Sequence, residues 1–331
     1  MRTRNRNLLV ILLILIALAV ARLGIAAEIY TSPMIDAHGH LGASFDWNTI
    51  VNVMDRNNIS RQIVMARYYG GPSGSADLPG NDELALELAS KYPGRFFPLV
   101  GMQKPELTGA SKWLNPDAAV EAILKDVEGK LATGRFCGIG KVIVKDFAYS
   151  SGRHAEQDNP IYSPFMQRLS QLAARHDVPI VLHMEGAPRL VQDFSRLLRE
   201  NLRVRYVWAH NSGRSTAPVI RAMLENHPNL YGDLAGMTNV GESGYGTGWP
   251  RMEEYTALIE KNSALFPDMR ELYEAFPDRF MIGMDVAHAP GMNPKDYGQR
   301  AQRFRQLLPQ LTPQAAAAFA DGNVARIFKL D

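Results

Sequence analysis

The chain has little cysteine and, apart from its first residues, little net charge. Its 331 residues include a single cysteine, Cys137, which excludes an intrachain disulfide and a cysteine-rich zinc site. Lysine and arginine number 36 and aspartate and glutamate 34, but four of the arginines lie within residues 1–27, which contain no acid. The remainder therefore carries 32 basic and 34 acidic residues. This balance lacks the basic surface that nucleic-acid binding requires, so we expect no nucleic-acid partner.

Residues 1–27 have the composition of an export signal. Three arginines in residues 1–7 precede the uninterrupted apolar run Leu8–Ala21, and small residues follow at positions 24, 26 and 27. The pattern predicts a cleaved secretory signal peptide. The alternative is a retained N-terminal membrane anchor, since Leu23–Ala27 could extend the apolar run beyond Arg22. In both cases we expect an exported protein, periplasmic or secreted, whose only membrane contact is this segment.

Residues 33–331 show no internal repeat and no shift in composition, so we expect a single domain. Short apolar runs alternate with stretches of helical spacing. The expected strands are Met34–Ala37, Gln62–Ala66, Phe96–Gly101, Gly138–Val144, Pro179–His183, Arg203–Ala209, Asn229–Leu234 and Arg279–Met284. The expected helices include Trp47–Asn57, Asp82–Lys91, Asp117–Thr133, Pro160–His176, Pro188–Glu200 and Ala217–Asn226. This alternation predicts a (β/α)8 TIM barrel, with an open doubly wound sheet as the alternative.

One long segment exceeds what a minimal barrel needs. The glycine-rich stretch Gly236–Pro250 follows the seventh expected strand, and the helix-like stretches Glu253–Asn262 and Met269–Ala275 separate it from the eighth. We interpret this segment as an insertion over the barrel mouth. It is either a surface excursion or a substrate lid.

Histidines stand at the ends of several expected strands. Strand alternation places His38 and His40 on the same side, where two imidazoles can converge on one metal, although a lone His-x-His pair is a weak motif. His183 and His210 are each the first strongly polar residue after an apolar strand. Asp285 ends the last strand, where it could instead cap a helix. Several imidazoles at one barrel edge favour a shared site, because a buried imidazole without a partner is costly.

These positions, together with Asp36 and the closing segment Gly322–Phe328, resemble the amidohydrolase superfamily. More narrowly, residues 34–330 are similar to the amidohydrolase-related branch that includes aminocarboxymuconate-semialdehyde decarboxylase-like enzymes. The resemblance implies one divalent ion, expected to be zinc with manganese or cobalt as alternatives, bound by His38, His40, His183 and Asp285. It also implies that Asp285 takes a proton from an activated water. His210 would then transfer a proton or bind a second metal.

Four further residues are candidate contacts of the site. By the same resemblance Lys141, in the fourth expected strand, could become a carbamate bridge between two metals; the alternative is a structural or substrate-anchoring role. Asp233, at the end of the seventh strand, could orient a ligand histidine. Arg67 and Arg214 could each bind a substrate carboxylate or form an ordinary surface ion pair.

The sequence thus predicts an exported, metal-dependent hydrolase that cleaves a C–O or C–N bond in a small molecule such as a lactone, ester or amide. Hydrolysis is favoured because export suits scavenging and the expected site needs only water as co-reactant. Two alternatives remain open: metal-dependent decarboxylation or hydration of an unsaturated or aromatic carboxylic acid, and a non-catalytic exported binding protein that keeps the barrel. The chain could also form a homo-oligomer.

Overall fold

The computed structural model describes residues 28–69, 78–147, 156–238, 258–260, 262–286 and 294–330. The expected leader, residues 1–27, and most of the expected insertion lie outside these residues. Within the described part of the chain, no helix is both long enough and apolar enough to cross a bilayer.

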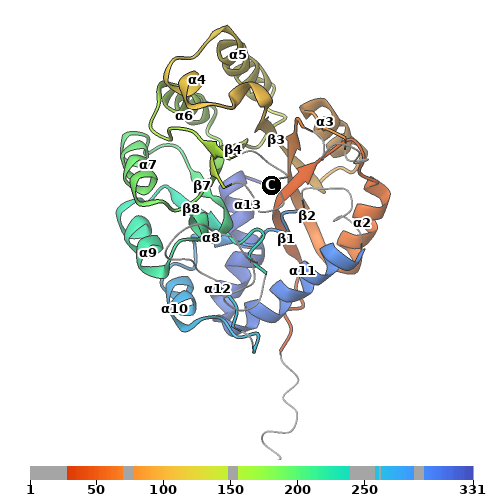
Figure 1. Ribbon diagram of the computed structural model, residues 1–331. Coiled ribbons are helices and arrows are strands. Elements are labelled where there is room, and N and C mark those ends of the chain that lie inside the picture. The colour runs from red at the N-terminus through yellow and green to blue at the C-terminus, as the bar shows by residue number, and fades with distance from the viewer. Residues whose placement is uncertain are drawn as a thin grey trace, which may run out of the picture.

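Eight parallel strands form the barrel that the sequence predicts (Figure 1). In order around the barrel they are β1 (Met34–Leu41), β2 (Ile59–Arg67), β3 (Phe96–Gln103), β4 (Ile139–Asp146), β6 (Ile180–Met184), β7 (Tyr206–Trp208), β8 (Leu230–Asp233) and β9 (Phe280–Met281). The last strand returns to the first: Gly39 bridges Val286, and the Ala37 N–H donates to the Ile282 carbonyl at 3.0 Å. A short strand, β5 (Gln157–Asp158), pairs antiparallel with β4 outside this order.

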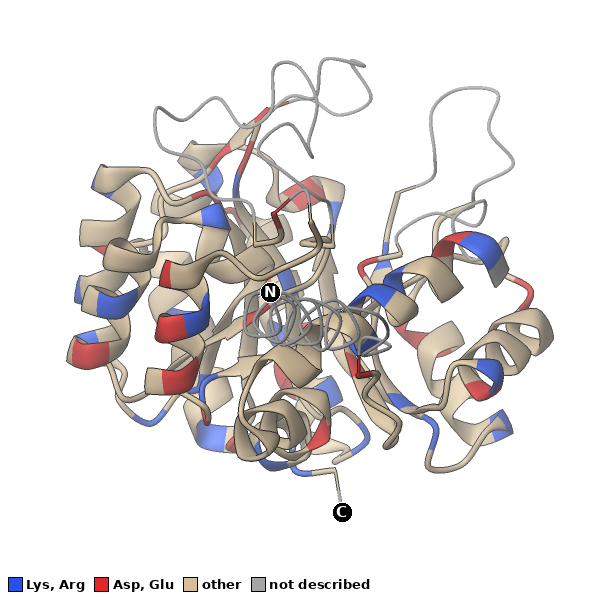
Figure 2. Cartoon of the chain, turned by 90° about the horizontal axis from the view of Figure 1, so that it is seen from below, with Lys and Arg blue, Asp and Glu red and all other residues tan. Residues whose placement is uncertain are grey.

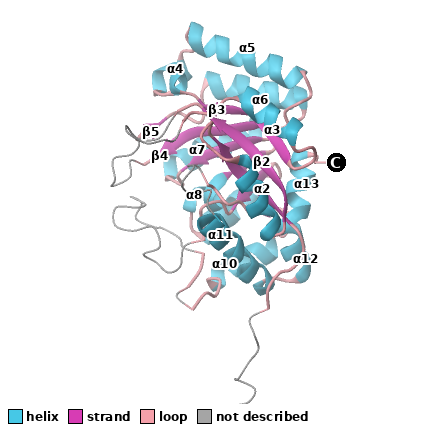
Figure 3. Cartoon of the chain, turned by 90° about the vertical axis from the view of Figure 1, so that its right-hand side faces the viewer, coloured by secondary structure: helices cyan, strands magenta, loops and turns pink. Residues whose placement is uncertain are grey.

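Helices surround the strands (Figure 3). They are α2 (Trp47–Arg56), α3 (Asp82–Lys91), α4 (Ala110–Leu114), α5 (Ala118–Ala132), α6 (Pro164–His176), α7 (Pro188–Glu200), α8 (Ala209–Arg214), α9 (Ala217–Asn226), α10 (Pro267–Ala275), α11 (Pro294–Leu307), α12 (Pro313–Ala317) and α13 (Asn323–Phe328). Capping side chains and prolines determine where many of these helices begin. Asn81 and Ser163 accept hydrogen bonds from N–H groups of the first turns of α3 and α6, and Pro188 begins α7, where a missing N–H costs nothing.

Several expected elements differ from the structure. The expected strand Arg203–Ala209 is formed only by Tyr206–Trp208, and the expected helix Pro160–His176 begins at Pro164. The first strand does not end at Ala37 but continues to Leu41, because residues 39–41 pair with β2. Gly39 permits this pairing, since a Cβ there would lie 2.6 Å from Gln62 Cδ. The last strand is only two residues long. The expected helix Glu253–Asn262 is wrong where it can be judged, because Ile259 instead forms an antiparallel bridge with Leu265.

The barrel interior is apolar at the amino ends of the strands. Side chains from seven strands pack there against α13 and the residues that follow it; they are Ile35, Ala37, Ile63, Met65, Leu99, Val181, Val207, Tyr231, Met281, Val324, Ile327, Phe328 and Leu330. Arg61 Nη1 also donates to the Leu330 carbonyl at 2.5 Å. The C-terminal helix therefore closes this end, and polar chemistry is left to the carboxyl ends of the strands.

The outer helices carry lysine and arginine interspersed with aspartate and glutamate (Figure 2). Between α5 and α6, for example, Arg168 pairs with Glu121 and Arg175 pairs with Glu128. Such exposed pairs contribute little stability individually. The helices that they join therefore depend mainly on the apolar faces packed against the barrel.

Candidate functional site

β1 contributes two histidines that converge on one carboxylate. His38 Nε2 lies 3.4 Å and His40 Nε2 3.3 Å from Asp285 Oδ1. On the opposite edge of its ring, His38 Nδ1 contacts Asp233 Oδ2 at 2.8 Å. A carboxylate accepts and does not donate, so His38 carries its proton on Nδ1 and presents the Nε2 lone pair toward Asp285. That Nε2 atom is buried and has no hydrogen-bond partner.

Asp285 is held at this point by its backbone. It has a φ of +51°, and its N–H donates to the His38 carbonyl at 3.0 Å. Burial acts to raise the pKa of its carboxyl, but the charge of Lys141 and the neighbouring histidines hold that pKa well below its ordinary value. Burial lowers the pKa of His40 to about 3. Near neutral pH the cluster therefore combines an ionised carboxylate with a neutral imidazole.

These three side chains fit a divalent metal. One ligand atom each from His38, His40 and Asp285 lies within 4.8 Å of the others. Two imidazole nitrogens and a carboxylate oxygen suit zinc, manganese or cobalt. The unpartnered His38 Nε2 is the atom that a metal would satisfy. The hydrogen bond from His38 to Asp233 is the outer contact that orients a ligand histidine in many metal sites.

His210 approaches the site from an unusual backbone segment. Residues 210–214, which make up most of α8, all have positive φ, with φ 60° at His210. In this arrangement the His210 N–H donates to Asp233 Oδ1 at 3.0 Å, and Nδ1 donates to the Ala235 carbonyl at 2.8 Å. Burial and the Lys141 charge lower the pKa of His210 well below its ordinary value. The neutral ring therefore presents the Nε2 lone pair to Lys141 Nζ, 3.1 Å away.

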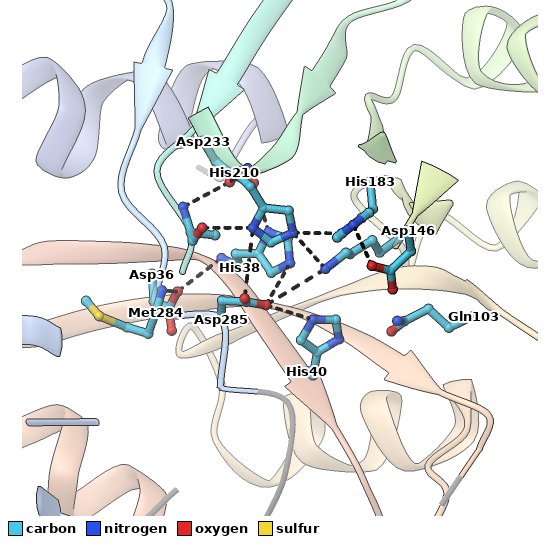
Figure 4. A network of polar contacts seen from close by, with 12 residues as sticks. Asp36, His38, His40, Gln103, Asp146, His183, His210, Asp233, Met284 and Asp285 are labelled. Atoms are coloured by element: carbon cyan, nitrogen blue, oxygen red, sulfur yellow. Dashed lines mark hydrogen bonds and ion pairs between the residues drawn. The ribbon is translucent and has the colours of Figure 1, made fainter. Parts of the chain in front are cut away.

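His183, the fourth expected metal ligand, lies at the same rim but faces a different group (Figure 4). Its Nδ1 contacts His210 Nε2 at 2.8 Å. Its Nε2 lies 3.4 Å from Asp146 Oδ1 and 3.4 Å from Glu185 Oε1. Ligand atoms of Asp146, His183 and Glu185 form a second group within 4.8 Å of one another. The structure thus divides the expected ligands between two clusters.

The remaining candidate residues are all buried at this rim. Lys141 Nζ lies 3.9 Å from Asp285 Oδ1, between that carboxylate and His210. Arg67 is fully buried, with its guanidinium 5.2 Å from the Tyr69 ring centre. Arg214 is also buried, and its Nη1 contacts Glu185 Oε1 at 2.5 Å. Neither arginine therefore forms the surface ion pair that the sequence left open.

The sequence reasoning missed three residues of this site. Asp146 ends β4, Glu185 follows β6 directly, and Gln103 ends β3. Gln103 Nε2 donates to the Tyr69 hydroxyl at 3.3 Å, while its buried Oε1 has no hydrogen-bond partner. Their position at strand ends was the available signal, because it is the same signal that identified His183 and Asp285.

Comparisons with known proteins agree with this architecture. A family model described as amidohydrolase matches residues 35–330. An uncharacterised TIM-barrel protein from Bordetella bronchiseptica is 14% identical, with a TM-score of 0.59 over 90% of this chain and 99% of that one. A dihydroxybenzoic acid decarboxylase from Polaromonas with bound manganese is 12% identical, with a TM-score of 0.54 over 91% and 98%. An amidohydrolase from Burkholderia multivorans with bound zinc is 14% identical, with a TM-score of 0.51 over 91% and 100%.

A search of curated proteins gave no match. The structural neighbours, at identities of 12–14%, share a fold with this chain.

Proposed function

Because the chain belongs to the amidohydrolase family, whose model spans residues 35–330, we propose that it is a metal-dependent hydrolase. The bond cleaved is a C–O or C–N bond in a small molecule such as a lactone, ester or amide. One observation carries this proposal: the ionised Asp285 carboxylate lies between two imidazole nitrogens, of His38 and His40, and the Lys141 ammonium. Such a carboxylate can bind a cation and accept a proton in the same place. Because residues 1–27 have the composition of an export signal, we further propose that the enzyme is exported.

We propose that His38, His40 and Asp285 hold one divalent ion, with zinc preferred and manganese or cobalt as alternatives. When bound, the ion supplies Lewis acidity and brings the pKa of a water to about 7. The zinc and manganese bound in two structural neighbours support this assignment. His183, the fourth ligand expected from the sequence, directs its Nε2 toward Asp146 and Glu185 instead.

The protein's own groups would divide the proton transfers between them. The Asp285 carboxylate, kept ionised by its neighbours, would accept a proton from the attacking water. Lys141 Nζ is the nearest ammonium to that carboxylate and can stabilise negative charge that develops on a substrate oxygen. The proton that Asp285 accepts would then go to the leaving group, and we propose His210 Nε2, which faces Lys141, as the group that relays it. We propose that Arg67 binds a substrate carboxylate. The same role for Arg214 remains a prediction.

Decarboxylation is the second candidate function. The Polaromonas neighbour is a decarboxylase, and this chain buries the cationic side chains of Arg67, the last residue of β2, and Lys141, in β4. Buried cations of this kind can bind an aromatic carboxylate substrate. The same metal site would serve either reaction.

Product analysis separates the two functions. The purified full chain is stripped with a chelator, reloaded with Zn²⁺ or Mn²⁺, and incubated with a panel of lactones, esters, amides and hydroxybenzoates. Hydrolysis yields an acid with an alcohol or amine, whereas decarboxylation releases CO₂. We expect metal-dependent hydrolysis that falls about 10²–10⁴-fold in Asp285→Asn. The matched control, Asp268→Asn, changes an exposed carboxylate in the first turn of α10 and should keep full activity.

Release of CO₂ from the hydroxybenzoates without hydrolysis of any other compound would favour the second candidate. Equal activity of the stripped and reloaded protein would exclude both.

A further inference from the structure

We propose that Arg300, on α11, is a positioning residue for Asp285. Arg300 Nη1 donates to the Met284 carbonyl at 2.5 Å and to the Asp285 carbonyl at 2.9 Å. The guanidinium thus holds the backbone that carries the carboxylate, and not the carboxylate itself. The residues expected from the sequence do not include Arg300, which lies in a helix and at no strand end. This role rests on the proposed function, in which Asp285 binds the metal and accepts a proton.

The turn at Asp285 needs such support because its conformation is unfavourable on its own. Asp285 has a φ of +51°, in the left-handed region that a residue with a Cβ rarely adopts. The last strand, β9, ends at Met281, so the turn lies beyond that strand. A backbone in this region persists where the surrounding contacts determine it. Arg300 supplies two of those contacts.

α11 also reaches the other side of this turn, through Asp36. The Met284 N–H donates to Asp36 Oδ1 at 2.8 Å, and the same oxygen accepts from the His38 N–H at 3.0 Å (Figure 4). Asp36 Oδ2 accepts from the Tyr297 hydroxyl at 3.0 Å. Tyr297 and Arg300 are three residues apart in α11 and therefore lie on one face of the helix. Together they hold both the N–H and the carbonyl of Met284.

This network is buried. Asp36 and Tyr297 are 0% and 1% exposed, and Gln62 Nε2 gives Asp36 a fourth hydrogen bond, at 2.7 Å. In a buried network a shift of one member leaves polar groups without partners, which is costly. Displacement of the turn would therefore break contacts at Asp36 as well as at Arg300.

The charge at the Asp285 carboxylate comes from other groups. Lys141 Nζ lies 3.9 Å from Oδ1, and the Nε2 atoms of His38 and His40 lie 3.4 Å and 3.3 Å from it. Burial acts to raise the pKa of this carboxyl, but Lys141 and the neighbouring histidines hold that pKa well below its ordinary value. The hydrogen bonds of Arg300 go to carbonyls instead. Removing Arg300 should therefore move the carboxylate and leave it ionised.

Three variants of the full chain test this role. Arg300→Met keeps the aliphatic stem and removes both hydrogen bonds, whereas Arg300→Lys returns a nitrogen that can donate to the carbonyls. The matched control is Arg303→Met, because Arg303 lies on the same helix, is also half-buried, and contacts Ser263 and Gln306 instead. Circular dichroism checks the folding of each. If Arg300→Met does not fold, Arg300→Gln, whose side chain is shorter than that of arginine, replaces it with the same expectation.

Hydrogen exchange of the metal-free protein reports on the turn without metal or substrate. The N–H groups of Met284 and Asp285 are both hydrogen-bonded, so we expect slow exchange in the native protein. Arg300→Met should speed their exchange, and Arg300→Lys should restore most of the protection. Arg303→Met should leave it unchanged. Native exchange at these two amides in Arg300→Met, or an equal loss of protection in Arg303→Met, would overturn the proposal.

Calorimetric titration with Zn²⁺ and steady-state kinetics then connect the turn to function. Arg300→Met should weaken Zn²⁺ binding about 10–100-fold and lower kcat by a similar factor, because it displaces a proposed ligand. KM should change little, since the proposed substrate contacts stay in place. Arg300→Lys should recover most of both losses.

The outcomes separate positioning from a merely structural role. A structural role would lower the unfolding midpoint of Arg300→Met and leave Zn²⁺ affinity and kcat of the folded protein at native values, which would overturn the proposal. If the native chain hydrolysed none of the compounds, the proposed function would fail. Amide exchange and Zn²⁺ affinity would still decide whether Arg300 positions Asp285.

Discussion

Asp233 Oδ2 accepts a hydrogen bond from His38 Nδ1 at 2.8 Å, across 195 residues of sequence. The other oxygen of Asp233 accepts from the backbone N–H groups of His210 and Ala235, each at 3.0 Å. The carboxylate therefore fixes the tautomer of one histidine and the backbone position of another. Because the proton of His38 is on Nδ1, Nε2 carries the lone pair that can bind a metal.

Asp233→Asn should weaken metal binding at the first cluster by about 10–100-fold. The asparagine oxygen can still accept from the backbone, but its NH₂ group would then face His38 Nδ1 and favour the tautomer protonated on Nε2. Calorimetric titration with Zn²⁺ measures the change, and Asp268→Asn is the control. Unchanged affinity in a folded Asp233→Asn would show that Asp233 does not orient His38.

Metal addition should stabilise the fold. A ligand that binds only the native state at 100 times its Kd adds about 2.7 kcal/mol to the free energy of unfolding. Urea unfolding of the stripped protein, with and without Zn²⁺, measures this increment. Asp285→Asn should reduce it, because a carboxylate of the first cluster is lost. If Zn²⁺ left the unfolding midpoint of the native sequence unchanged, the proposed metal site would be wrong.

Gly213→Ala should be strongly destabilising. Gly213 has a φ of +68°, and a Cβ there would lie 2.2 Å from the Met184 carbonyl oxygen. Gly94 has a φ of +73°, but its Cβ would meet no atom within 4 Å. Gly94→Ala should therefore lower the free energy of unfolding by only about 1–2 kcal/mol, the cost of a side chain in the left-handed backbone region. Gly213→Ala should lower it clearly more, because its Cβ also overlaps the Met184 carbonyl oxygen. Equal unfolding free energies for the two variants would contradict the close packing around α8.

His227 should make stability depend on pH. It is buried at the end of α9, where its Nε2 contacts Ser195 Oγ at 2.8 Å, and burial together with Arg199 lowers its pKa below 6.5. Below pH 6.5 the unfolded chain then binds the proton more readily than the folded chain. The contribution of His227 is complete above that pH and is lost as the pH falls toward the folded pKa.

Comparing the native sequence with His227→Gln between pH 5 and 8 tests this pH dependence. The native protein should lose up to about 1.4 kcal/mol per pH unit more than the variant on acidification. His176→Gln, a change at the end of α6, is the control. Parallel stability curves for native and His227→Gln protein would contradict the prediction.

The sequence alone predicted the barrel, because the patterns that specify its strands and helices are local. Apolar runs of strand length alternate with helices such as Asp82–Lys91 and Pro188–Glu200, which begin and end as predicted. Their boundaries are set by side chains and prolines within a few residues of each end. Strand alternation also predicted that His38 and His40 lie on one side of β1.

Only the tertiary structure decided which side chains share a cluster. His183 and Asp285 both stand at strand ends, yet His183 faces Asp146 and Glu185 because its Nδ1 binds His210 and Arg214 binds Glu185. Sequence periodicity gives the side of a strand on which a residue lies, but not the direction of its ring nitrogens. That direction depends on strand register and on the left-handed turn at His210, which bring together groups that are distant in sequence.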